Sequence, residues 1–390
     1  MQDPDRDSIS LSAEIPYFCQ RLATLNLAQA QELGGDNCKR HSGELAELPN
    51  VSRTETLPLE QEEANDMSKK TIAKQAFENK LVICSIVTPF SILGALIRIG
   101  LQRLETYPGA PVFGLVYAQW IGCFIMGIVV ESKAHLLEWY LPLHIGLSTG
   151  LCGSITTFSS WQLDIFKAFS NYDAYNHNSG YNILSAISQL LVTLAMSFNG
   201  LVFGYHVGGW FKKQVSDPIT LEIVSRGYRT NQMSIIDWGV FLFGVACWIG
   251  VILAAIFAQS LQDVAFACVF APVGALMRWY LSKFNTLQQG RFMFGTFAAN
   301  MIGTLVLAVL TLVQTGVAST TIACDVVSGL ANGLCGCLTT ISTFVVELSN
   351  LPIRRSYVYG LSSIVLGQCF MFLVLGTFIW TQGVQRTCPS

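Results

Sequence analysis

Charged side chains are scarce in this sequence of 390 residues. Asp, Glu, Lys and Arg make up 12% of the chain, against about 25% in a soluble globular domain. Apolar residues make up 52%, so the polar groups are too few to cover a surface that faces water. This composition excludes an ordinary soluble protein and indicates a chain whose solvent is lipid.

Motifs for metal binding and catalysis are also missing. The five histidines follow no metal-ligand spacing, and most of the 12 cysteines lie inside apolar runs, where they behave as small hydrophobes. We therefore expect neither a zinc site nor a disulfide framework. The sequence has no GxxxxGK[ST] loop, no nucleophile–base constellation and no RNA-binding motif. These absences disfavour ATP-driven transport, enzymatic activity and a nucleic-acid partner.

The polar residues that are present concentrate at the N-terminus. Residues 1–79 have no sustained periodicity and predict a mostly disordered tail without a signal peptide. After Lys80, nine apolar segments approach the roughly 20 residues that a membrane-spanning helix needs. They cover approximately residues 81–101, 111–130, 142–168, 182–207, 236–259, 264–281, 292–314, 325–349 and 356–381.

The basic residues of the loops are distributed unequally between the two sides. Alternate loops hold most of them: Lys69, Lys70, Lys74, Lys80, Lys133, Lys212, Lys213, Arg226, Arg229, Lys283, Arg291, Arg354 and Arg355. The opposite side holds only Arg103, Lys167 and Arg386. By the positive-inside rule, the N-terminus is cytosolic and the C-terminus lies outside.

The spans contain an internal repeat. The first match pairs VTPFSILGALIRIGLQRL (87–104) with VFAPVGALMRWYLSKF (269–284). The second pairs FGLVYAQWIGCFIMG (113–127) with FGTFAANMIGTLVLA (294–308), and the third pairs GLSTGLCGSITTFSSWQLD (146–164) with GLANGLCGCLTTISTFVVE (329–347). Three matches in the same order indicate a duplicated unit of four helices.

The ninth segment, near 236–259, belongs to neither copy. One extra span between two four-span units turns the second copy upside down, which predicts an inverted repeat. The expected fold is therefore an all-α membrane protein of nine spans behind a disordered tail. Its parts are a cytosolic tail (1–79), a first repeat (80–210), a cytosolic loop with the linking helix (211–260) and a second, inverted repeat (261–390).

The third segment of each copy is rich in Gly, Thr and Ser. Such residues at membrane depth allow close helix packing, or they mark a break in the helix, which is tolerated only against protein or a watery cavity. Carbonyl groups freed at a break can hold a small cation, and hydroxyl groups can line an ion path. Because the pattern recurs in both copies, we favour a functional break.

The combination of this break with the GAxxR helix and the helix that follows it resembles the Fluc/FEX fluoride channels of the CrcB-like family. The two-copy arrangement with a linking helix is similar to the eukaryotic exporters, and the likeness covers about residues 81–381. The resemblance implies an antiparallel pair of units, two pores lined by Phe, and a buried sodium ion at the centre. Lipid surrounds the protein, and the two copies in one chain imply that a monomer is functional.

Transferred onto this chain, the family pattern implies that the two pores differ. One pore would combine Asn300, Phe344 and Phe158. The other would combine Gln119, Trp161 and Ile341, which depart from the pattern. The last helix of each copy also offers a polar track, Ser185 and Ser188 in the first copy or Tyr359, Ser362 and Ser363 in the second, and we favour the second. We expect one working and one vestigial pore; two working pores that tolerate these substitutions are the alternative.

The remaining expected sites lie at the break and near the ends of spans. The resemblance places a structural sodium ion on the main-chain carbonyls of Gly153, Thr156, Gly336 and Thr339, since carbonyl oxygen suits a hard cation. Arg98 and Arg278 either line an anion vestibule or extend to the membrane interface. The sequence leaves both alternatives open.

The function expected is passive export of cytosolic fluoride across the plasma membrane, driven by the inside-negative potential. A secondary transporter that couples fluoride to protons is the alternative. Its mark would be a carboxylate within the membrane, and Asp164 and Glu347 occupy matching positions near the ends of their spans.

Overall fold

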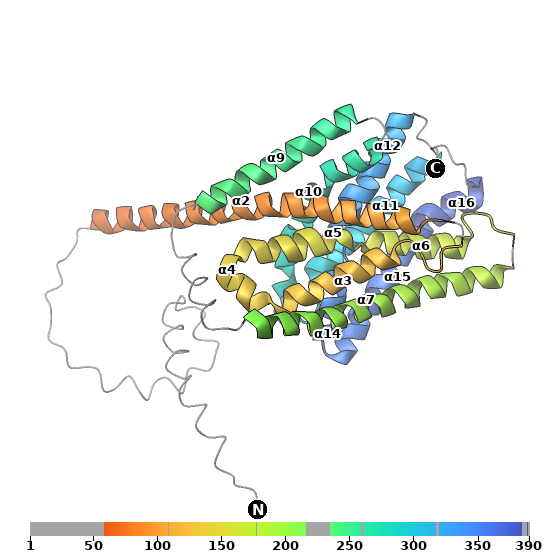
Figure 1. The fold of residues 1–390 in the computed structure, drawn as a ribbon, viewed down its shortest axis with the longest axis horizontal. Coiled ribbons are helices and arrows are strands. Elements are labelled where there is room, and N and C mark those ends of the chain that lie inside the picture. Colours follow the sequence, from red (N-terminus) through yellow and green to blue (C-terminus); the bar gives the residue numbers. More distant parts are fainter. Residues whose placement is uncertain are drawn as a thin grey trace, which may run out of the picture. The chain divides into compact units, whose positions relative to one another are not determined.

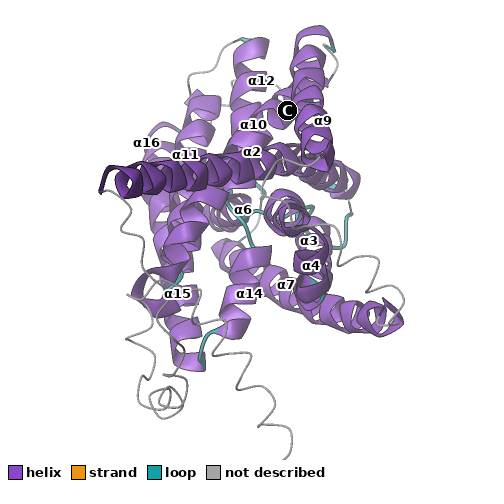
Figure 2. Ribbon diagram, turned by 90° about the vertical axis from the view of Figure 1, so that its left-hand side faces the viewer, coloured by secondary structure: helices purple, strands orange, loops and turns teal. Residues whose placement is uncertain are grey.

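The computed structural model describes residues 58–107, 109–176, 178–215, 235–258, 261–316, 320–383 and 388. All regular structure within these residues is helical, as Figure 2 shows. Residues 69–390 form one compact unit. Residues 1–57, the larger part of the expected tail, lie outside the described residues.

The first helix begins earlier than predicted. Helix α2 covers Pro58–Glu105, so residues 58–79 are helical where a disordered segment is expected. Proline is favourable at the first helical position because its missing N–H would have no partner there.

The first copy continues with six further elements. Helix α3 (Val116–Glu131) is followed by α4 (Lys133–Ile145), which has a non-helical residue, Tyr140, inside it. The chain then passes through a π-helical turn η1 (Gly146–Cys152), one turn α5 (Gly153–Ile155) and helix α6 (Phe158–Ser170). The long helix α7 (Ser179–Val215) closes the copy and packs along α3 (Figure 1).

The second copy repeats this order. Its elements are α10 (Gln262–Ser282), η3 (Lys283–Gly290), α11 (Phe294–Gly316), α12 (Thr321–Gly329), η4 (Leu330–Cys335), α13 (Gly336–Leu338), α14 (Ser342–Asn350), α15 (Ile353–Met371), η5 (Phe372–Gly376) and α16 (Thr377–Gln382). A π-helical turn, η4, again precedes the break. The two copies therefore distort their third segment at the same place.

The linking helix α9 (Ile235–Phe257) packs on both copies. Gly244 lies directly on the carbonyl of Ser85 in α2, so even a methyl group would collide there. The indole N–H of Trp248 donates to the carbonyl of Val269 in α10 at 3.2 Å. Helix α9 is thus attached to the first helix of each copy, and Figure 1 shows it running beside α2 and α10.

Seven helices within the described residues are long and apolar enough to cross a membrane. Two of the nine predicted spans are different in form. Helix α3 is apolar but has 16 residues, and the predicted span 142–168 is the broken series from α4 to α6. Its second-copy counterpart, the series from α12 to α14, is broken in the same way but counts among the seven as Thr321–Asn350.

Contacts between loop regions fall into two groups at opposite ends of the helices. One group holds the ion pair Arg103–Asp263 (2.5 Å) and the hydroxyl contact Tyr172–Thr315 (3.2 Å). The other holds the Tyr140 hydroxyl donating to Asp237 (2.6 Å) and the ion pair Lys212–Glu131 (3.5 Å).

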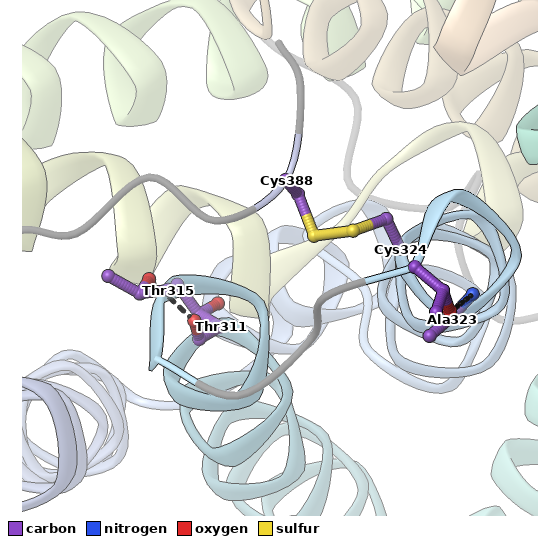
Figure 3. Close-up of a disulfide and its surroundings, with 6 residues drawn as sticks. Thr311, Thr315, Ala323, Cys324 and Cys388 are labelled. Carbon is purple, nitrogen blue, oxygen red and sulfur yellow. Dashed lines mark hydrogen bonds between the residues drawn. A yellow bond between two sulfur atoms is a disulfide. The ribbon is translucent and has the colours of Figure 1, made fainter.

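A disulfide joins Cys324, near the start of α12, to Cys388 beyond the last helix (Figure 3). The scattered cysteines of the sequence do not predict this bridge. Figure 3 shows it beside Thr315, so the C-terminal end of the chain lies with the Tyr172–Thr315 contact. The cysteines inside apolar runs are free thiols, as expected for small hydrophobes.

Candidate functional site

Both predicted breaks are present at the Thr-Thr pairs. Thr156 and Thr157 have extended backbones, with φ/ψ of −94°/150° and −145°/129°. Thr339 in the second copy is extended in the same way, with φ/ψ of −91°/155°. Each break frees backbone groups from helical hydrogen bonding, and both lie fully buried in the protein.

The two breaks contact each other through their threonine hydroxyls. The hydroxyl oxygens of Thr156 and Thr340 lie 3.1 Å apart, and those of Thr157 and Thr339 lie 3.0 Å apart. In the repeat alignment Thr156 corresponds to Thr339 and Thr157 to Thr340, so each contact is the counterpart of the other. Such reciprocal pairing is the property of an interface related by a two-fold axis.

Backbone groups follow the same reciprocal rule. The N–H of Ser342 donates to the Thr156 hydroxyl, and the N–H of Ser159 donates to the Thr339 hydroxyl, both at 3.1 Å. Each copy thereby caps the first turn of the helix that follows the break in the other copy. The two copies complete each other at this junction.

Asn300 and Gln119 make the same two hydrogen bonds to the break of their own copy. The Asn300 amide accepts from the N–H of Thr340 at 2.9 Å and donates to its carbonyl at 3.3 Å. Gln119 makes the same two bonds with Thr157, at 3.3 and 2.7 Å. Because Gln reproduces the bonds that Asn makes, this substitution leaves the anchoring of the break intact.

Phe158 and Phe344, predicted to share one pore, meet edge to face. Their ring centroids lie 5.5 Å apart at an interplanar angle of 71°. The Phe344 ring also packs on Tyr359, with centroids 5.2 Å apart. The three rings come from both copies and are wholly buried, so they form a continuous aromatic series across the junction.

Trp161 and Ile341, predicted for the other pore, are also wholly buried. The Trp161 ring stacks edge to face on Phe158, with centroids 5.5 Å apart. Its indole N–H donates to the carbonyl of Gln189 in α7 at 3.1 Å. Trp161 therefore bridges two elements of the first copy.

The serines of the expected polar track bond within their own helix. The hydroxyls of Ser362 and Ser363 both donate to the carbonyl of Tyr359, at 3.0 and 2.8 Å. Ser363 is buried and Ser362 is half-buried. Both oxygens keep lone pairs, while their hydrogens are engaged.

Glu347 is the centre of a cluster that the sequence did not assign to the site. Its carboxylate accepts from the Thr296 hydroxyl at 2.5 Å, the Asn285 amide at 3.0 Å and the Tyr359 hydroxyl at 2.7 Å. Four elements, η3, α11, α14 and α15, are joined by these bonds. The sequence did contain a signal for this cluster: its four residues all lie at ends of predicted spans that the positive-inside rule places on the same side of the membrane.

Arg98 and Arg278 lie at the junction between the copies. They are 1% and 4% exposed, so the interpretation that they extend to the membrane interface is wrong. The Arg98 guanidinium donates to the carbonyl of Asn332, and that of Arg278 donates to the carbonyl of Thr149. Asn332 and Thr149 are aligned residues, so each arginine reaches the same place in the opposite copy.

The four residues expected to hold sodium come together at this junction, but a guanidinium occupies part of their donor set. Arg278 donates to the carbonyls of Gly153 at 2.6 Å and Thr339 at 3.3 Å. The Arg98 guanidinium also lies against Gly336, but its buried Nη1 has no hydrogen-bond partner among the described residues. A sodium ion on these carbonyls would meet a like charge, so the residues as placed do not leave the set free for it.

The profile of the family described as "CrcB-like protein, Camphor Resistance (CrcB)" matches residues 85–204 and again residues 265–377. The two matches together span more than half of the chain. The chain belongs to the CrcB-like family. The two CrcB-like segments coincide with the two copies recognised in the sequence, and the linking helix α9 lies between them.

Curated CrcB-like relatives match most of the chain. "Fluoride export protein 1" of Candida albicans is 34% identical over 364 residues, covering 87% of this chain and 91% of the relative. "Fluoride export protein 1" of Neurospora crassa is 30% identical, covering 98% of this chain and 80% of the relative. "Fluoride-specific ion channel FluC 1" of Staphylococcus epidermidis is 32% identical over 119 residues, 30% of this chain and 90% of the relative. No solved structure matches the chain.

Proposed function

We propose that this chain is a fluoride-selective passive channel that exports cytosolic fluoride across the plasma membrane. The names of its relatives in two fungi, which match nearly their whole length, support this function. The observation that carries the proposal is the meeting of Phe158 and Phe344, one from each copy, beside the hydroxyl contacts of the two breaks.

The chemistry of these groups suits a small, strongly hydrated anion. An aromatic ring has a positive edge, so ring edges can replace part of the lost hydration without holding the ion tightly. Asn300 has two amide hydrogens, and one bonds the Thr340 carbonyl. The other can donate to an anion. Conduction requires this kind of weak, repeated binding.

We propose that one route conducts and the other is vestigial. The working route combines Phe158, Phe344 and Asn300 and continues along Tyr359 and the serines beside it. The vestigial route combines Gln119, Trp161 and Ile341. Since Gln119 bonds its break as Asn300 does, the difference between the routes rests on the aromatic positions, where Trp161 and Ile341 replace two Phe.

We propose nine spans, with the two copies inverted, the N-terminus cytosolic and the C-terminus outside. The seven long helices, α3 and the broken series from α4 to α6 make nine segments. The loop contacts support this odd number of spans, because each contact joins two loops that the positive-inside rule assigns to the same side of the membrane. The Cys324–Cys388 disulfide adds support, since such bonds persist on the oxidising side of a membrane.

A single chain contributes both copies to each route, so we propose that the monomer conducts. The structural sodium ion stays a separate proposal that only the family resemblance supports, and nothing in the conducting route depends on it. Unfolding of the purified protein in sodium or in N-methyl-D-glucamine buffer tests it. A higher midpoint in sodium would support the ion, and equal midpoints would remove it.

The function is tested by fluoride efflux from liposomes that contain the purified chain. A passive channel moves charge, so efflux should stall until valinomycin lets potassium leave with the fluoride. A transporter that moves fluoride with a proton is the alternative, and its efflux would proceed without valinomycin and acidify the outside. Chloride efflux under the same conditions should be absent. Efflux that needs no ionophore would overturn the channel.

A further inference from the structure

A cavity of about 580 Å³ opens in the first copy. Residues of α6, α7 and the start of α3 line it, among them Asp164, Lys167, Ser185, Gln189 and Leu115. Tyr172 also lines it, and its hydroxyl contacts Thr315. The cavity thus lies at the end of the molecule where the C-terminal disulfide lies, which we propose to be the outer end.

The alignment of the two copies shows which residues of the second copy correspond to the residues that line this cavity. Leu115 corresponds to Thr296, and Asp164 corresponds to Glu347. In the last helix, the buried positions of α7 and α15–η5 coincide when Ser185 is aligned with Tyr359. The aligned buried pairs are Ala186 with Gly360, Thr193 with Gly367, Ser197 with Met371, and Leu201 with Leu375.

The cavity is therefore the first-copy counterpart of the Glu347 cluster. In the second copy, the hydroxyls of Thr296 and Tyr359 close onto the carboxylate. Leu115 has no hydroxyl, and Ser185 lacks the ring that fills the space in the second copy. The same backbone consequently leaves an opening instead of a hydrogen-bonded cluster.

Trp161 adjoins the lining of this cavity through its hydrogen bond to Gln189. Its side chain is wholly buried, and its indole N–H bonds the backbone carbonyl of Gln189, a residue that lines the cavity. The opposite side of the indole packs on Phe158. By the two-fold relation, Trp161 and Ile341 hold the positions that Phe344 and Phe158 hold in the working route. The indole is thus held between a residue that lines the cavity and Phe158.

We infer that this cavity is a blind vestibule: it admits water and small solutes from outside, and Trp161 closes it. The inference deepens the proposed function, because it places the block of the vestigial route and names the residue responsible. Its first half depends on the geometry and on the proposed orientation, and not on conduction, since access to the cavity does not require that either route conducts fluoride.

Access is tested with the variant Ser185→Cys and a small, membrane-impermeant thiol reagent added outside intact cells. Peptide mass spectrometry reads the modification at residue 185 alone, so the native cysteines do not interfere. The matched control is Thr193→Cys, because Thr193 lies further along the same helix α7 but is buried. We expect modification at residue 185 with unchanged fluoride efflux, and no modification at residue 193. An unmodified Cys at 185 overturns the vestibule, and modification that stops efflux shows that the cavity belongs to the working route.

The block is tested with Ile341→Cys, alone and combined with Trp161→Ala. We expect residue 341 to be protected while Trp161 is present and modified from outside once Trp161 is removed. Size-exclusion chromatography checks that both variants fold. Modification at residue 341 with Trp161 in place, or protection that persists without it, contradicts the role of Trp161. If the chain conducts no fluoride at all, the proposed function fails while this labelling pattern still stands.

Discussion

At the scale of single residues, the glycines of the breaks explain how two guanidinium groups fit inside the membrane. Gly153 lies against the guanidinium of Arg278, and Gly336 lies against that of Arg98. Any side chain would displace the arginine from carbonyls that it bonds. The alignment predicts that these residues are equivalent, but only the fold shows that each arginine crosses to the opposite copy.

Gly153→Ala should therefore destabilise the protein. The added methyl group collides with Arg278, and such overpacking costs about 1–3 kcal/mol. The control is Gly250→Ala, because Gly250 of α9 has open space around its Cα. There Ala should be neutral or slightly stabilising, as a better helix former. The midpoint of thermal unfolding in detergent measures both, and equal midpoints would contradict the junction described here.

Asn300 and Gln119 show what residue type alone cannot tell. The sequence predicts that Gln119 marks a degenerate pore, yet the longer amide makes the same pair of bonds to its break. The identity of the second aromatic position is more informative, because the indole of Trp161 is larger than the ring of its counterpart Phe344. The longer side chain of Gln119 can still reach the same hydrogen-bond partners as Asn300. A larger ring such as that of Trp161, by contrast, occupies more volume in a packed route, and the packing cannot compensate for it.

At the scale of elements, the third segment of each copy departs from a helix where the sequence predicts. Gly, Thr and Ser indicated a break, and both breaks are present at the Thr-Thr pairs. The π-helical turns before them, η1 and η4, have no such signal, because their geometry follows from packing against α2 and α10. The helix before residue 80 did have a signal, in Pro58.

The Glu347 cluster joins four elements of the second copy by hydrogen bonds, whereas its first-copy counterpart is an open cavity. Glu347→Ala would leave three donors without an acceptor, at a cost of about 1–3 kcal/mol for each one that stays buried. Asp164→Ala is the matched control, because Asp164 borders the open cavity. We expect a clearly lower unfolding midpoint for the first variant and a small change for the second. Equal losses would show that the two carboxylates have the same structural role.

At the scale of the whole molecule, the duplicated sequence, the odd linking helix and the loop charges agree on an inverted pair. The sequence could supply the order of spans because apolar length and charge are local properties. It could not supply the disulfide, since Cys324 and Cys388 are brought together only when α12 and the C-terminal segment reach the same end.

The disulfide tests the proposed orientation. A membrane-impermeant reductant applied to intact cells should free both Cys324 and Cys388, because we place them outside. Alkylation before and after reduction, read by mass spectrometry, measures this. The reduced protein should also unfold at a lower temperature, as loss of a native disulfide costs about 2–5 kcal/mol in small domains. Thiols that are free before reduction, or that an impermeant reductant cannot reach, would contradict the orientation.

The central claim is that a single route conducts, through the aromatic pair that the two copies form together. Fluoride efflux from liposomes that contain Phe344→Ile or Trp161→Ile tests it most directly, because the two residues are aligned and the replacement is the same. The account predicts that Phe344→Ile lowers efflux at least about tenfold, or about 1.4 kcal/mol in the barrier, while Trp161→Ile retains it. Loss of efflux in Trp161→Ile with normal efflux in Phe344→Ile would contradict the assignment of the working route.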